Sequence, residues 1–125
     1  PRGTAVTTPA TDTRHLPVAV STTFDVPGYD TVQFVGSAYG LVVRSMGFAK
    51  GFTASFKALA GGEVKQYTTL LEDARRHALD RLVQNAQALG GNAVIGMRYD
   101  SSEVGQGLTE VVAYGTAVVV RRQEG

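Results

Sequence analysis

The hydrophobic pattern along the chain separates strand-like from helix-like segments. Four stretches that are rich in apolar and β-branched residues predict strands, and they are Val18–Thr23, Thr31–Arg44, Ala93–Tyr99 and Leu108–Arg121. Apolar residues spaced three and four apart predict a short helix at Phe48–Ala60 and a long helix at Lys65–Leu89. The predicted order is therefore strand, strand, helix, helix, strand, strand.

The predicted strand Thr31–Arg44 has apolar residues on both of its faces. One face carries Val32, Phe34, Gly36, Ala38 and Gly40, and the other carries Val35, Tyr39, Leu41 and Val43, with a bulge as a possible crossing point. A strand that is apolar on both faces is expected to be buried on both faces. The Val-rich final strand suggests the same.

The long helix has a predicted buried face made of residues one turn apart, namely Tyr67, Leu71, Ala74, Ala78, Leu82, Ala86 and Leu89, widened by Leu79 and Val83. It ends at Leu89-Gly90-Gly91-Asn92, and we predict that Gly90 or Gly91 has a positive φ. Pro27-Gly28 has the residue order of a type II turn. We expect Asp100–Gly107 to connect the last two strands, with Gly105 and Gly107 in turn conformations.

This order of elements predicts an α+β fold, with a helix packed on a mainly antiparallel sheet. The chain of 125 residues suits a single domain. Residues 1–17, rich in Thr, Pro and Ala, are interpreted as a flexible leader, and residues 18–122 as the domain.

Composition narrows the classes of function. Charged residues make up only 18% of the chain, which favours a subunit that covers part of its surface with copies of itself. A formal net charge of +1 gives no basic excess for nucleic acid, and the absence of cysteine excludes disulfides and thiolate chemistry. No apolar run approaches a membrane span. We expect a cytoplasmic protein; a first residue that is not Met leaves a removed signal peptide open.

Candidate catalytic and metal-binding residues are few. His15 lies in the leader, and His77 follows Asp73 by one helical turn, but two ligands do not define a metal site. Ser37 lacks the glycines of a nucleophile elbow. Gly105-Gln106-Gly107 joins two strands, whereas a dinucleotide loop joins a strand to a helix. We therefore expect no enzyme, no catalytic residue and no cofactor, with a metal ion as the open alternative.

Phe48, Phe52 and Phe56 form a stripe on the predicted short helix, opposite Lys50 and Lys57. The stripe fits ordinary core, a contact with another subunit, or a helix lying on a membrane surface. We expect all three side chains to be mostly buried, with at least one at a subunit interface.

From Ser21-Thr22-Thr23 to Arg121 the chain resembles the YbjQ family of small bacterial domains. The resemblance rests on the order and spacing of short segments, which are Ser21-Thr22-Thr23, Ala60-Gly61-Gly62, Tyr67, Ala86 to Gly96, and Tyr114 to Val118. It implies a ring-shaped homopentamer, a subunit fold similar to dodecin, and heavy-metal binding. Departures from the family at Glu63, Val64 and Thr68 mean that no metal ligand is carried over.

Together these observations predict a non-enzymatic homo-oligomeric module, pentameric by resemblance, that acts in assembly or binding. The alternative is a metal-ion-binding protein that uses His77 and carboxylate ligands. The expected partner is the chain itself, with no nucleic acid and no membrane span.

Overall fold

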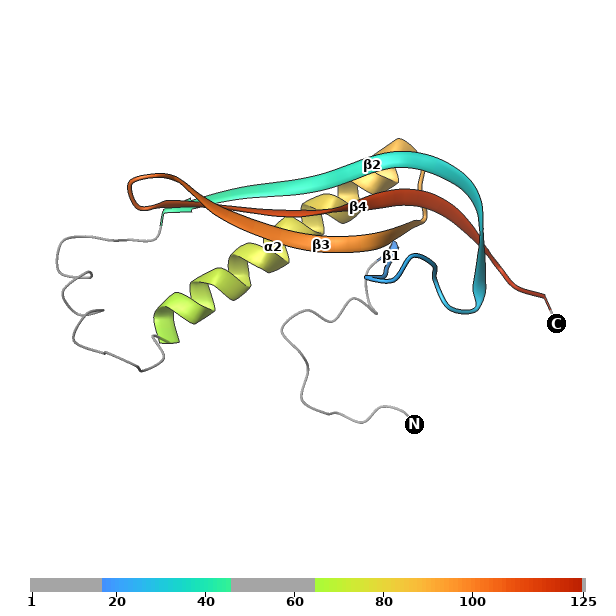
Figure 1. The fold of residues 1–125 in the computed structure, drawn as a ribbon, viewed down its shortest axis with the longest axis horizontal. Coiled ribbons are helices and arrows are strands. Elements are labelled where there is room, and N and C mark those ends of the chain that lie inside the picture. Colours follow the sequence, from blue (N-terminus) through green and yellow to red (C-terminus); the bar gives the residue numbers. More distant parts are fainter. Residues whose placement is uncertain (1–16, 46–64, 125) are drawn as a thin grey trace.

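The computed structural model describes residues 17–45 and 65–124. Within them, a single long helix packs on one face of a four-stranded sheet (Figure 1). The elements are β1 (Ala19–Val20), β2 (Tyr29–Ser45), α2 (Lys65–Leu89), β3 (Ala93–Gly105) and β4 (Leu108–Arg122). The α+β fold class and the helix Lys65–Leu89 are thereby confirmed. The predicted helix Phe48–Ala60 lies outside the described residues.

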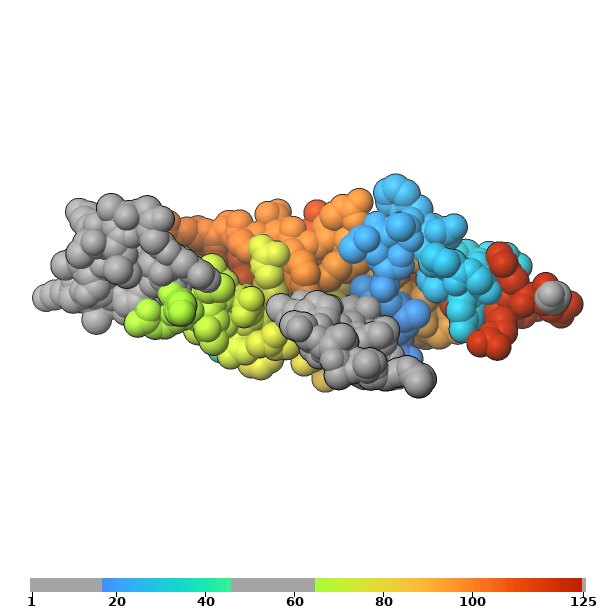
Figure 2. Space-filling view, turned by 90° about the horizontal axis from the view of Figure 1, so that it is seen from below, coloured from blue at the N-terminus to red at the C-terminus, as the bar shows by residue number. Residues whose placement is uncertain are grey.

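The sheet has the strand order β1-β3-β4-β2 and is mixed. β4 lies between β3 and β2 and pairs antiparallel with both, whereas β1 pairs parallel with β3. In the view from below, β1 and the turn after it (blue) lie beside β3 (orange) (Figure 2). β2 is therefore one edge of the sheet.

β1 is shorter than the strand predicted at Val18–Thr23. The parallel ladder ends at the pair Val20–Val94, because β3 bulges where Gly96 adopts a φ of 62°. Beyond this point Thr23 turns back, and its backbone N–H donates to Ser21 Oγ at 3.0 Å. The backbone N–H of Gly96 still donates to the carbonyl of Thr23, so the turn stays attached to β3.

β3 is longer than predicted, because it continues through Gly105. Residues 100–105, expected to form a loop, are exposed, yet they pair with β4 as far as Gly105–Leu108. Cross-strand hydrogen bonding overrides their low strand propensity. Only Gln106 and Gly107 connect the strands, and Gly107 alone supplies a positive φ, of 72°.

Small residues allow α2 to lie directly on β2. A Cβ atom on Gly40 would stand 2.2 Å from the carbonyl oxygen of Ala78 and 2.3 Å from the backbone nitrogen of Leu82. The core between helix and sheet contains Ala74, Ala78, Leu82 and Ala86, as predicted, packed on residues such as Ala38, Val42, Val111 and Ala113. Leu89 differs from the prediction, since it is 53% exposed beside the edge of the sheet.

A second, smaller core lies on the opposite face of the sheet. Ala93, Val118 and Val120 are buried there under Val26, which lies between β1 and β2, and Tyr29, the first residue of β2. Adjacent residues Ala93 and Val94 belong to different cores, as the alternation of side chains along a strand requires. β4 is therefore buried on both faces toward its carboxyl end.

Candidate interaction surface

Most of the sheet face turned away from α2 is uncovered by any described residue. We call this surface the open face, and it consists of Tyr39, Leu41 and Val43 on β2 with Val112 and Tyr114 on β4. Tyr39, Val43 and Tyr114 are 59%, 51% and 43% exposed, and Leu41 and Val112 are half-buried. The prediction that β2 is buried on both faces is therefore wrong for the single chain.

The strand register arranges the open face in rows. Tyr39 lies opposite Tyr114, and Leu41 lies opposite Val112. On the far side of β4, Arg98 and Asp100 of β3 continue these two rows. The result is an apolar strip over β2 and β4 with a polar border on β3.

A β-bulge explains why the faces of β2 were assigned wrongly at its start. The register with β4 shifts between Phe34 and Gly36, so that Phe34 stands opposite Val118 on the side of the open face. Phe34 is consequently 73% exposed, although the simple alternation grouped it with the buried residues Ala38 and Gly40. Val32, also placed in that group, is 45% exposed.

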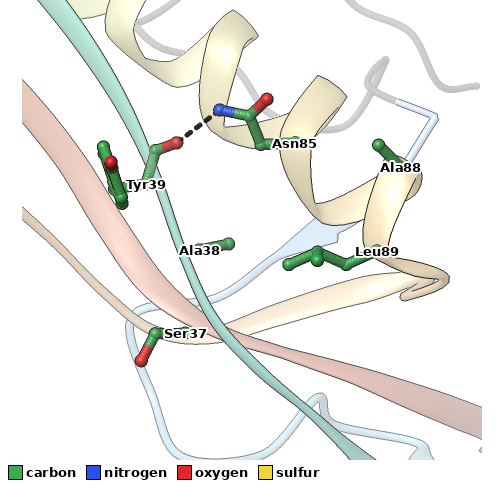
Figure 3. Close-up of a pocket in the computed structure, with 6 residues that line it drawn as sticks. All are labelled: Ser37, Ala38, Tyr39, Asn85, Ala88 and Leu89. Carbon is green, nitrogen blue, oxygen red and sulfur yellow. Dashed lines mark hydrogen bonds between the residues drawn. The ribbon is translucent and has the colours of Figure 1, made fainter.

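An open pocket of about 370 Å³ lies where the carboxyl-terminal end of α2 passes the edge of β2. Ser37, Tyr39, Asn85 and Leu89 line it, and Asn85 reaches across to the carbonyl oxygen of Tyr39 (Figure 3). The aromatic ring of Tyr39 points away from the helix. The residues that line this pocket beside Ser37 include no histidine.

Asp73 and His77, the metal-ligand candidates among the described residues, each contact an arginine. Asp73 Oδ1 accepts a hydrogen bond from Arg76 at 2.9 Å, and Nδ1 of His77 contacts the guanidinium group of Arg44. In residues 17–45 and 65–124 no group of three His, Cys, Asp or Glu side chains could hold a metal ion. His15 and the phenylalanine stripe Phe48, Phe52 and Phe56 lie outside the described residues.

Asn92 has a structural role that the sequence pattern did not reveal. Its side-chain amide donates to the carbonyl of Val120 at 3.0 Å, and its Oδ1 accepts from the backbone N–H of Val120 at 2.7 Å. The two bonds resemble those that a paired residue of a neighbouring strand would form with Val120, and they join the turn after α2 to β4. The asparagine after two glycines indicates a turn, but it does not reveal the bond to Val120, which is distant in the sequence.

No helix formed by residues 17–45 and 65–124 has both the length and the apolar character needed to cross a membrane.

Comparison with known proteins places the chain in a family. The YbjQ family model, described as "Putative heavy-metal-binding", matches residues 18–121. A UPF0145 protein from Bradyrhizobium sp. (strain ORS 278) is 54% identical over 101 residues, which are 81% of this chain and 91% of that protein. The chain therefore belongs to the YbjQ family, whose similar proteins carry the name UPF0145.

Similar proteins also occur in archaea, so the expectation of a bacterial family was too narrow. A UPF0145 protein from Sulfurisphaera tokodaii is 45% identical over 109 residues, which cover 87% of this chain and 96% of that protein. A crystal structure of a protein of unknown function from Pediococcus pentosaceus aligns with a TM-score of 0.46 at 19% identity, covering 83% of this chain and 98% of that one.

Proposed function

We propose that the protein is a non-enzymatic homo-oligomeric module whose copies associate through the open face. The observation that carries this proposal is the uncovered apolar strip over β2 and β4. Contiguous exposed apolar surface in a folded protein marks an interaction site. The low content of charged residues, 18%, also favours a second copy as the partner.

A ring is the form of assembly we favour, with five copies as the family resemblance implies. In a closed ring the same two patches meet at each interface, so no copy is left with an unpaired patch. The open faces of the copies would converge around the axis and cover one another's tyrosines. The subunit fold would then correspond to the dodecin-like arrangement that the family resemblance implies.

Replacing Tyr114 by Glu tests this proposal. Tyr114 is 43% exposed in the single chain, so the subunit should keep its fold. At the interface, however, the charge would lose water without a designed partner. We expect the mass measured by light scattering to fall toward that of the monomer while the circular dichroism spectrum is retained.

The matched control is Gln87→Glu, which introduces the same charge at an exposed position of α2 away from the open face. This variant should keep the wild-type mass. A folded Tyr114→Glu variant of unchanged mass would contradict assembly through the open face.

Metal binding is the second candidate function, because the family description favours it. His77 and Asp80 line a shallow pocket on α2, and a neighbouring copy would have to supply further ligands. Calorimetric titration with zinc, copper and nickel tests this candidate. Binding that disappears in His77→Ala supports it, and the absence of heat with all three ions rejects it.

A further inference from the structure

The outer edge of β2 presents backbone groups that no described strand pairs with. In an antiparallel pair, residues whose N–H and C=O both point toward the partner alternate with residues whose groups both point away. The carbonyls of Tyr39 and Leu41 accept bonds from α2, so these two residues belong to the outward-pointing set. Their N–H groups consequently point outward as well.

Two side chains of α2 occupy this edge. Arg81 Nη1 donates to the carbonyl oxygen of Leu41 at 2.7 Å, and Asn85 Nδ2 donates to that of Tyr39, also at 2.7 Å (Figure 3 for Asn85). Four residues of helix rise about 6 Å, and two residues of strand span about 7 Å, so the two donors match two successive outward carbonyls. Gly40, between those carbonyls, lets the helix come close enough for both bonds.

The opposite edge of the sheet is formed by the short strand β1 and, beyond it, by β3. β1 pairs with β3 only at Ala93 and Val94, and the turn after it is bonded as far as Met97. From Asp100 to Gly105 no described strand pairs with the outer side of β3. A second copy could therefore add its β3 to an accessible β2, and each addition would leave a new edge for the next.

We propose that Arg81 and Asn85 protect the edge of β2 from the β3 edge of a second copy. By occupying the carbonyls of Tyr39 and Leu41, the two side chains take two of the four backbone hydrogen bonds that an added strand could form with these two residues. This inference concerns the edge of the sheet and does not depend on the assembly proposed for the open face.

The test is the double variant Arg81→Met/Asn85→Ala, which removes both donors and keeps the aliphatic part of the arginine. We expect its mass by light scattering to rise with protein concentration beyond that of the wild type, together with thioflavin T fluorescence. Arg81→Lys/Asn85→Gln, which retains donors at both positions, should restore the wild-type mass. The control Arg122→Met/Gln87→Ala makes matched changes at exposed positions away from the β2 edge and should behave as the wild type.

A third variant separates edge pairing from aggregation of unfolded chains. Leu41→Pro in the double-variant background removes an outward N–H, and proline is tolerated on an edge strand. If the double variant associates through the β2 edge, adding Leu41→Pro should return its mass to that of the wild type. A folded double variant with wild-type mass would overturn the proposal, and so would association that persists with Leu41→Pro. If the double variant does not fold, Arg81→Met and Asn85→Ala are measured singly by the same criteria.

Discussion

Gly90 ends α2 with a φ of 101°, and its N–H donates to the carbonyl of Gln87 at 2.9 Å. The prediction that Gly90 or Gly91 would take a positive φ is confirmed, and the structure selects Gly90. Gly91 matters for a different reason, because a Cβ atom there would stand 3.2 Å from the Cβ of Ala117. Gly90 is needed for its left-handed backbone conformation, whereas Gly91 is needed because a side chain there would crowd Ala117.

These two roles lead to a prediction for Gly90. Open space surrounds the position, so Gly90→Val should destabilise the fold through left-handed strain alone, by about 1–2 kcal/mol. Gly90→Asn should cost less, because asparagine tolerates this conformation. Chemical denaturation of both variants measures the difference, and equal stabilities would contradict a strain mechanism.

Asn92 shows what a residue pattern leaves out. Its position after two glycines was evident, but its two bonds to Val120 depend on the register between β3 and β4. Register is set by contacts between segments distant in the sequence, so the local pattern predicts a turn there without predicting its partner.

At the scale of elements, the close contact between α2 and β2 is centred on Gly40. Gly40→Ala should force the helix away from the strand, because the added methyl carbon would overlap the helix backbone. Overpacking of this kind costs about 1–3 kcal/mol or more. We expect a lower melting temperature and faster hydrogen exchange in the β2–α2 pair.

The control for Gly40→Ala is Ser37→Ala on the same strand, where the side chain is exposed. It should change the stability far less. A Gly40→Ala protein as stable as the wild type would show that α2 moves away at little cost.

Predictability also differs between elements. The helix and the long strands were predictable, because 25 residues of helical periodicity and 17 residues of strand leave strong patterns. The ends of β1 and β3 were not, since a bulge at Gly96 shortens the first and pairing with β4 lengthens the second. The open face was only partly predictable. Its apolar residues were recognised in the sequence, but their exposure could be predicted only by knowing that α2 covers the other face of the sheet.

For the whole molecule, we expect light scattering of the wild type to give roughly five times the subunit mass of 13.2 kDa. The physical reason is the open face, which would otherwise leave Tyr39, Val43 and Tyr114 in water. Dilution from micromolar to nanomolar concentration provides the control, because a specific ring dissociates over a defined range. A monomer at micromolar concentration would contradict the assembly.

The pairing of β2 with β4 also governs the order in which the chain can fold during synthesis. β2 leaves the ribosome well before its strand partner, because Leu108 to Arg122 follow only after α2 and β3 have been made. The β3–β4 hairpin closes across a two-residue turn and can form quickly, whereas β2 must wait with its tyrosines, leucine and valines unpaired. Nascent chains of this protein therefore pass through a period in which chaperones that bind extended apolar segments have a clear target at β2.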